Sequence, residues 1–543
     1  MGPLSITKEA FGSLVRERWD EVPPGGCAMV PIAASALSDQ LTPVVAYRRL
    51  VRPDARLDPS FLFESVEGGD RAGRYSILGV RPSVEVIARE HQVEVHDHLA
   101  GTILEPAHHE ADPLLVPRRV SSRWALIEAA ERRGLPACLP GGWVGYASYD
   151  TVRYAEPGKL PFASAPPDDR DIPDLHFCFY DGVVVFDQTT KLVHAVRLAR
   201  VKALDEVNEA YDRAAAAVRD TLATIEAPTP PLPFGAGDDG VRPTMPPSNM
   251  TRAHHAEMVE RCREYIAAGD IFQVVVGQRF RKESEADPFN VYRALRATNP
   301  SPYMVYLQCA GCVLVASSPE ILCRVERRGA GDRVVTNRPL AGTRRRGCTT
   351  AEDRALAAQL LADPKERAEH TMLVDLGRND VGRVARPGSV SLDATFEIER
   401  YSHVMHISST VTGVLRDELD CWDALRSTLP VGTVSGAPKV RAMQIIDEVE
   451  PVRRGPYGGG FGYVTLSGEM DIALALRTVV VQPVTDDGGG PGPWRYDFQA
   501  AGGIVMDSEA GAEFDETVNK ASAMVRSLEL VERVFTDDPS TVG

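Results

Sequence analysis

Three apolar stretches in the C-terminal half decide the fold: GFGYVT (residues 460–465), IALALRTVVV (472–481) and YDFQAAGG (496–503). They are short and together rich in β-branched and aromatic residues, which indicates strands. Because they follow one another with no helical pattern between them, they do not fit a strict alternation of strand and helix. We therefore expect an α+β fold with large, mostly antiparallel sheets packed as a sandwich and helices on the outside.

Helices with clear start signals accompany these strands. One is expected to begin at Asp363-Pro364, with the Asp as N-cap and the Pro as the first helical residue. Another runs from Ala437-Pro438 to about Val449, and a third spans about Gly511 to Val534. The N-terminal part instead shows short strand signals, at residues 28–33, 61–64, 83–88 and 182–186.

One segment, from Ala227 to Asn249, is dense in Pro, Gly and Asp and is typical of a linker or an irregular loop. It divides the chain into an N-terminal part, residues 1–226, and a C-terminal part, residues 250–543. We expect each part to form a subdomain, with the segment 227–249 between them.

The bulk composition narrows the possible partners. The 543-residue chain has 60 basic and 76 acidic residues, a net charge of −16. This balance argues against nucleic acid or an anionic membrane, so an anionic substrate would need a locally basic pocket. Nine cysteines are scattered, and neither a secretory signal nor an apolar run of about 18 residues is visible. We expect a reduced, cytoplasmic, soluble protein.

Two pairs of glutamates share the same spacing: Glu366 with Glu369, and Glu513 with Glu516. In a helix, residues three apart lie on one face, so each pair brings two carboxylates together. Four oxygen ligands of this kind suit Mg²⁺. Solvated helix faces are the alternative, and Asp363-x-x-Glu366 also matches a capping box, which makes Glu369 the stronger ligand candidate of its pair.

Other segments are suited to binding an anion. The Gly-rich turn from Gly432 to Lys439 leads into a helix start, although it does not have the spacing of a nucleotide-binding loop. Arg477 lies in a strand-like apolar run, where an unpaired Arg is costly, so it must pair with an acid or bind a ligand carboxylate. The backbone N–H groups of Ala501 to Ile504 can approach a small anion closely.

Two residues could transfer protons. Glu320 follows Ser317-Ser-Pro319 at the end of a hydrophobic strand, where burial would raise its pKa and make it a general acid. His406 lies in the mixed run from Tyr401 to Thr410 and could also act, or could be a hydrogen-bonded core histidine.

In combination, these stretches resemble the chorismate-utilising enzymes, and among them most closely the large, aminase component of anthranilate synthases. The resemblance covers about Thr42 to Leu528. It rests on five motifs in order: Arg338 to Arg344, Glu369 to Asp380, Gly432 to Lys439, Ala473 to Thr478, and Ala501 to Lys520.

The resemblance implies a metal site and a substrate site. Mg²⁺ would be held by Glu369 and Glu516, with Glu366 and Glu513 close by, and would bind the ring carboxylate of chorismate. The remaining substrate contacts would come from Thr433, Lys439, Tyr463, Arg477, Gly502 and Gly503, of which Tyr463, Arg477 and the two glycine amides would bind the enolpyruvyl carboxylate.

The resemblance also implies the reaction. Glu320 would protonate the departing 4-hydroxyl while ammonia attacks C2, and His406 would assist the loss of pyruvate that leaves anthranilate. Relatives that add water have a catalytic Lys at the position of Gln278, and aminodeoxychorismate synthases have a nucleophilic Lys at the position of Ala341. Neither residue here can take those roles, which favours amination by free ammonia.

A motif in the N-terminal part resembles one wall of a tryptophan feedback site, and a second motif resembles its other wall, which implies a regulatory subdomain at residues 1–226 and a catalytic one at residues 250–543. The motifs are FLFES (61–65) and NPSPYM (299–304). Glu64 and Ser65 would bind the ammonium group of the inhibitor, and the indole would lie against Pro302, Tyr303 and Met304.

The sequence shows no nucleophilic Cys in a Gly-rich elbow with a downstream His, so we expect ammonia to come from a separate glutamine amidotransferase subunit in a hetero-oligomer. Two alternatives stay open. One is an aminodeoxychorismate, isochorismate or salicylate synthase, and the other is a catalytically silent subunit that binds tryptophan.

Overall fold

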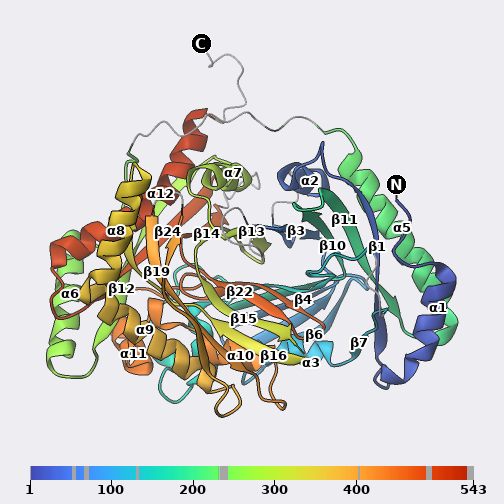
Figure 1. The fold of residues 1–543 in the computed structure, drawn as a ribbon, viewed down its shortest axis with the longest axis horizontal. Helices are drawn as coiled ribbons and strands as arrows, with labels where there is room; N and C mark the ends of the chain where they lie inside the picture. The colour runs from blue at the N-terminus through green and yellow to red at the C-terminus, as the bar shows by residue number, and fades with distance from the viewer. Residues whose placement is uncertain are drawn as a thin grey trace.

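The computed structural model describes residues 2–51, 57–65, 73–129, 134–229, 232, 242–329, 331–401, 404–484 and 492–534. Two large sheets form its centre, and helices surround them (Figure 1). The expected α+β sandwich with mostly antiparallel sheets is therefore confirmed.

The first sheet, called sheet A here, is antiparallel except for the pair β1–β7. Its strands, in spatial order, are β20 (Gly436–Ala437), β12 (Gln273–Ser284), β24 (Trp494–Ile504), β23 (Thr478–Pro483), β14 (Cys312–Ser318), β13 (Tyr303–Cys309), β2 (Ser60–Glu64), β3 (Tyr75–Val80), β10 (Gly182–Asp187), β11 (Leu192–Val201), β1 (Cys27–Leu37) and β7 (Trp124–Leu126).

The second sheet, called sheet B here, is antiparallel, and β18 (Ser391–Arg400) pairs with its strand β19. Its other strands, in spatial order, are β17 (Leu340–Arg345), β19 (Val404–Val414), β16 (Asp332–Asn337), β15 (Ile321–Arg328), β22 (Met470–Leu474), β21 (Gly460–Thr465), β8 (Gly142–Ala147), β9 (Leu175–Tyr180), β4 (Val84–Arg89), β5 (Gln92–Asp97) and β6 (Thr102–His109).

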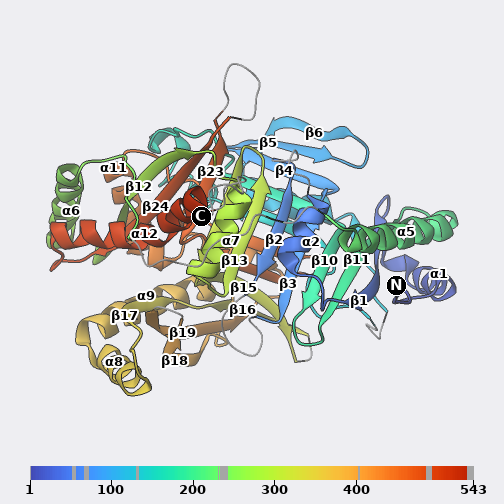
Figure 2. The same cartoon turned by 90° about the horizontal axis from the view of Figure 1, so that it is seen from above.

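Helices cover the outer faces of both sheets. They are α1 (Lys8–Glu17), α2 (Pro43–Leu50), α3 (Val116–Ser121), α4 (Val152–Ala155), α5 (Val207–Glu226), α6 (Arg252–Ala267), α7 (Pro288–Thr298), α8 (Thr350–Ala362), α9 (Pro364–Gly382), α10 (Cys421–Thr428), α11 (Lys439–Val449) and α12 (Ala510–Val534). Figure 2 shows α12, α7, α2 and α5 lying across one face of sheet A. The three helices expected from start signals are α9, α11 and α12, and Asp363 caps α9 as predicted.

Both sheets continue from the N-terminal part of the chain into the C-terminal part. In sheet A, Glu64 on β2 pairs with Met304 on β13, and in sheet B, Ala147 on β8 pairs with Gly460 on β21. Residues 1–226 and 250–543 therefore share both sheets, and part of the segment 227–249 lies outside the described residues. The division into regulatory and catalytic parts stays a prediction.

One predicted strand was wrong. The apolar run 472–481 is not one strand but two, because β22 ends at Leu474 in sheet B and β23 begins at Thr478 in sheet A. Between them Arg477 has φ 47°, in the left-handed region. The run is apolar on both sides of the point where the chain passes from one sheet to the other. The hydrophobic pattern alone therefore did not reveal the break between the two strands.

Three apolar cores hold the layers together. The core between the sheets includes Phe61, Leu307 and Phe461, and the other two large cores lie beneath the helices on either outer face. In the part of the chain that is described, no helix is both long enough and apolar enough to cross a membrane.

Candidate active site

Three of the four predicted metal ligands lie around the end of β24, and the fourth, Glu366, lies against Gly342. Glu366 and Glu369 come from α9, and Glu513 and Glu516 from α12. A Cβ built on Gly502 would lie 3.1 Å from Oε2 of Glu513 and 3.9 Å from Oε1 of Glu516. Two helices far apart in the sequence therefore bring their carboxylates to one strand end.

Gly503 lies at the same end of β24. A Cβ built there would lie 3.9 Å from Oε1 of Glu369 and only 2.6 Å from Nε2 of Gln273, which donates a hydrogen bond to the same Glu369 oxygen (3.2 Å). Side chains at Gly502 and Gly503 would therefore crowd the space between the carboxylates, and glycine leaves it open.

Electrostatic repulsion marks these carboxylates as neighbours. Burial raises the pKa of Glu369, and the charges of Glu366 and Glu516 raise it further. Burial and the charge of Glu516 likewise raise the pKa of Glu513. Such a set favours a cation, because a cation removes the repulsion.

Two cations of the protein offset part of this negative charge. Lys520 lies 2.7 Å from Oε1 of Glu516, and Arg344 lies 3.0 Å from Oε1 of Glu366. Oε2 of Glu513 is buried and has no hydrogen-bond partner among the described residues. Oxygen donors with one such unsatisfied atom fit a hard divalent cation.

The carboxylates do not converge tightly. Within the described ranges, no three of Glu366, Glu369, Glu513 and Glu516 place oxygen atoms within 4.8 Å of one another. A bound cation would draw them closer or keep waters as its other ligands, as Mg²⁺ commonly does.

Glu320, between β14 and β15, is buried at 3% exposure and accepts a hydrogen bond from Oγ1 of Thr433 (2.8 Å). Burial raises its pKa to about 8, and the nearby charge of Glu399 raises it too. At neutral pH the carboxyl is therefore largely protonated and can give a proton to a leaving group.

The pKa of His406, on β19, is lowered, whereas that of Glu320 is raised. The Nδ1–H of His406 donates to the carbonyl of Gly342 (2.9 Å), and Nε2 is buried without a partner in the described structure. Burial lowers the pKa of His406 to about 4, with a smaller contribution from the positive charge of Arg477. The ring is therefore neutral, and its Nε2 is free to accept a proton.

Arg477 is placed by the crossing between the sheets. Its carbonyl accepts a hydrogen bond from the backbone N–H of Ser317 (3.1 Å). Its guanidinium makes no hydrogen bond or ion pair with any described residue, and burial lowers its pKa. A half-buried, unpaired guanidinium beside His406 is suited to bind a carboxylate from outside the protein.

Two predicted substrate residues lie in other surroundings. Nζ of Lys439 lies 2.6 Å from Oδ1 of the buried Asp380, so its charge is already paired. Tyr463 lies in a cavity with Tyr303 and Arg324. The structure therefore does not bring Tyr463 together with Arg477.

Tyr457 was missed by sequence reasoning. It is buried against Val275 and Ala501, with Leu476 packed on the same group, so it contacts the sequence neighbours of Arg477 and of the glycines of β24. Burial raises the pKa of its hydroxyl to about 12, so it stays a hydrogen-bond donor. The sequence signal that could have identified Tyr457 was its position just before the Gly458-Gly-Gly460 turn.

Gln278, on β12, uses both ends of its amide within the protein. It accepts from Oγ of Ser248 (2.6 Å) and donates to Oγ1 of Thr517 (2.7 Å), the residue after Glu516. It therefore anchors the ligand-bearing turn of α12, and as an amide it cannot act as a base.

The residues predicted for tryptophan gather around one cavity of about 610 Å³. It is lined by Glu64, Ser65, Pro302, Tyr303 and Met304. The pairing of β2 with β13 brings the two motifs together. Phe63, Ile77 and Phe461 add apolar walls, so the cavity offers both polar and apolar contacts.

This cavity also reaches neighbours of the two proton-transfer residues. Pro319 and Tyr401 line it, and Pro319 immediately precedes Glu320. The rings of Tyr401 and His406 have centroids 5.7 Å apart. A ligand in the cavity would thus contact neighbours of both proton-transfer residues.

Comparison with known proteins agrees with this arrangement. The chain belongs to the family of chorismate binding enzymes, whose family model matches residues 59–526. Within that family it is similar to anthranilate synthases. Anthranilate synthase alpha subunit 1, chloroplastic, from Oryza sativa subsp. indica is 49% identical over 532 residues, which cover 94% of this chain and 90% of the relative.

Two bacterial proteins give the same result. Anthranilate synthase component 1 of Pseudomonas putida is 44% identical over 521 residues, covering 95% of this chain and 99% of the relative. The crystal structure of anthranilate synthase component I from Streptococcus pneumoniae TIGR4 superposes with a TM-score of 0.68 at 33% identity, covering 90% of this chain and 99% of that one. The resemblance read from the motifs is confirmed.

Proposed function

We propose that this chain is the aminase subunit of an anthranilate synthase and converts chorismate and ammonia to anthranilate and pyruvate, the first step of tryptophan biosynthesis. The observation that carries the proposal is that the site combines a protonated carboxyl with a neutral imidazole. Glu320 is buried and protonated, held by Thr433, while the neutral His406 lies near the unpaired guanidinium of Arg477.

The first step forms a C–N bond and breaks a C–O bond. Ammonia attacks C2 of chorismate, the ring double bonds shift, and the 4-hydroxyl leaves. Glu320 gives its proton to that oxygen, so that water departs, and Thr433 holds the carboxyl in place through its 2.8 Å hydrogen bond. The added nitrogen loses one proton to solvent.

The second step makes the ring aromatic. Nε2 of His406 takes the proton from C2, the C3–O bond breaks, and the enolpyruvyl group leaves and is protonated to pyruvate. Arg477, with the backbone N–H groups of Gly502 and Gly503, would hold the enolpyruvyl carboxylate, and Tyr457 packs against their neighbours Leu476 and Ala501.

Mg²⁺, when bound by Glu369 and Glu516 with Glu366 and Glu513 close by, would neutralise the ring carboxylate of chorismate. The oxygen-only donor set and the unsatisfied oxygen of Glu513 support this assignment. The chain's own contribution is to keep Gly502 and Gly503 free of side chains between the two helices.

We further propose that tryptophan inhibits the enzyme from the 610 Å³ cavity. Its ammonium group would lie at Glu64 and Ser65, and its indole against Pro302, Tyr303 and Met304. Oγ of Ser65 is buried and unpartnered within the described residues, which supports a ligand contact there. Glutamine-derived ammonia would come from a separate glutamine amidotransferase subunit.

The test is the formation of anthranilate, followed by its fluorescence. Purified chain is mixed with chorismate and ammonium at alkaline pH, with and without Mg²⁺ and tryptophan. We expect a signal that requires Mg²⁺ and is suppressed by tryptophan. Consumption of chorismate without anthranilate would refute the proposed product, and no consumption at all would refute catalysis.

A further inference from the structure

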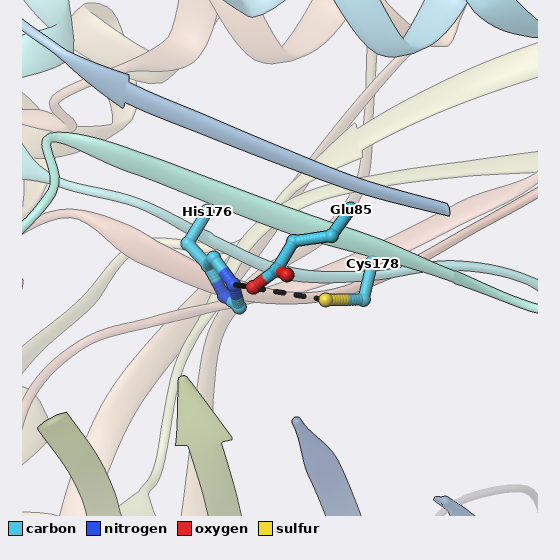
Figure 3. Close-up of side chains that lie close together, drawn as sticks. All are labelled: Glu85, His176 and Cys178. Atoms are coloured by element: carbon cyan, nitrogen blue, oxygen red, sulfur yellow. Dashed lines mark hydrogen bonds and ion pairs between the residues drawn. The ribbon is translucent and has the colours of Figure 1, made fainter. Parts of the chain in front are cut away.

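A second polar cluster lies buried in sheet B, and the proposed reaction does not use it. It consists of Glu85 on β4 with His176 and Cys178 on β9 (Figure 3). Glu85 pairs with Cys178 across the two strands, and His176 is two residues before Cys178, so all three share one face of the sheet. Their exposures are 6%, 1% and 1% in that order.

The three side chains point toward one another. Nε2 of His176 lies 2.6 Å from Oε1 of Glu85 and 3.6 Å from Sγ of Cys178. Counting only the residues that the structure describes, this is the one group of three or more His, Cys, Asp or Glu side chains with ligand atoms all within 4.8 Å. Nδ1 of His176 has no partner there, so contacts at Nε2 orient the ring.

A candidate fourth ligand and a path to solvent lie beside this group, with His98 outside the set of ligand atoms that are all within 4.8 Å of one another. Nε2 of His98, in the turn after β5, lies 2.8 Å from Oε2 of Glu85. The His98 side chain is 40% exposed, whereas that of His176 is 1% exposed. His98 thus connects the buried group to the surface.

The chemistry of these ligands distinguishes them from the glutamate site. One sulfur, two nitrogens and one carboxylate oxygen match the tetrahedral sets that Zn²⁺ takes, whereas Mg²⁺ prefers oxygen only. Zn–N bonds of about 2.0 Å and Zn–S bonds of about 2.3 Å imply ligand separations of about 3.3–3.6 Å. The distance between His176 and Cys178 already fits, and Glu85 would move away from His176 by less than about 1 Å.

The charge balance is also compatible with a bound cation in place of protonated imidazoles. Cys178 belongs to the apolar core between the two sheets, together with Leu307 and Cys309. A carboxylate at the edge of such a core is costly unless its charge is compensated. A divalent ion bound by the Glu85 carboxylate and a Cys178 thiolate has a net charge of zero.

We propose that Glu85, His176 and Cys178, completed by His98, bind one Zn²⁺ or similar transition-metal ion that links β4 to β9. Binding would release the proton of the Cys178 thiol, and that of any charged imidazole, to solvent. With four protein ligands the site is closed and structural.

The experiment uses the full chain, stripped with a chelator and then titrated with Co²⁺. Excess Mg²⁺ is present throughout to occupy the glutamates of α9 and α12. We expect one equivalent of Co²⁺ to bind with the absorption of a thiolate-to-cobalt transition and to be displaced by Zn²⁺. Cys178→Ser should abolish that absorption, and His176→Gln should weaken binding at least about tenfold.

Two further variants make the test decisive. His98→Gln changes a partly exposed side chain, so it should fold and yet weaken Co²⁺ binding. Cys27→Ser removes another buried thiol, on β1, and should change neither affinity nor absorption. Wild-type chain without thiolate absorption would overturn the proposal and leave a hydrogen-bonded network in its place. Equal binding by wild type, Cys178→Ser and His98→Gln would overturn it too.

Discussion

Glu320 shows how one buried side chain links stability to chemistry. Its ordinary pKa of 4.5 rises to about 8 because burial disfavours the charged form. Its contribution to stability is therefore fully present below about pH 4.5, is lost as pH rises toward 8, and does not fall further above that.

Replacing Glu320 with Gln, which resembles the protonated acid, should remove this pH dependence. We expect the variant to be more stable than wild type above pH 8, by on the order of 4 kcal/mol, and nearly equal to it at about pH 5. Urea unfolding at both pH values measures the difference. An equal gain at both values would contradict the assigned pKa.

The same substitution should greatly reduce turnover. General acids typically contribute about 10²–10⁴-fold, and Gln cannot donate the proton. We expect kcat to fall by about that factor with little change in KM for chorismate. In wild type at constant free ammonia, activity should decline as pH rises above about 8, where Glu320 loses its proton. A rate unaffected by either change would remove Glu320 from this role.

Tyr457 and Tyr463 form a matched pair for testing the site. Tyr457 lies beside Ala501 and Leu476, whereas Tyr463 lines the cavity with Tyr303. We expect Tyr457→Phe to raise KM for chorismate about tenfold, the cost of one hydrogen bond to a charged group. Tyr463→Phe should change tryptophan inhibition instead. The reverse result in steady-state kinetics would restore the prediction made from sequence.

At the scale of elements, the active site depends on β24 passing between α9 and α12 without side chains. Gly502→Ala would place a methyl group 3.1 Å from Oε2 of Glu513. We expect the Mg²⁺ concentration for half-maximal activity to rise about tenfold or more, while the Tm changes little. Gly158→Ala, where a Cβ would meet nothing within 4 Å, is the control. Equal effects of the two would argue against the metal position.

The pairing of β2 with β13 should likewise control inhibition. Ser65→Ala removes a buried hydroxyl whose oxygen has no partner among the residues described. A hydrogen bond to a charged group contributes about 1.5–3 kcal/mol, so tryptophan inhibition should weaken about 10–100-fold while kcat is kept. Inhibition curves measure this. Unchanged sensitivity would exclude Ser65 from the inhibitor site.

At the scale of the whole molecule, inhibitor cavity and active site are parts of the same two sheets. Met304 on β13 pairs with Ser317 on β14, and the N–H of Ser317 donates to the carbonyl of Arg477. A ligand that shifts β13 would therefore displace Arg477 through β14, the one strand between them. Two separately folded domains would not provide this path.

The proposed glutaminase partner gives a prediction at the same scale. We expect the chain alone to use ammonium but not glutamine, because no glutaminase motif is found in its sequence. Addition of a glutamine amidotransferase subunit should confer glutamine-dependent anthranilate formation and a larger mass by native mass spectrometry. Glutamine-dependent activity of the purified chain alone would contradict the expectation of a separate subunit.

The local sequence determined which segments form helices and strands and which reactive side chains the protein has. The spacing of three between the glutamates, the cap at Asp363 and the strand at 460–465 all depend on near neighbours, so they could be predicted. The position of Glu320 after a buried strand likewise indicated a raised pKa before the structure was considered.

Only the tertiary structure decided which distant residues meet. It divided the run 472–481 between two sheets, it packed Tyr457 rather than Tyr463 against Leu476 and Ala501, and it paired Lys439 with Asp380. It also brought Glu85 to Cys178 across β4 and β9. These outcomes depend on pairing and packing between segments far apart in the chain, which one sequence's local pattern does not encode.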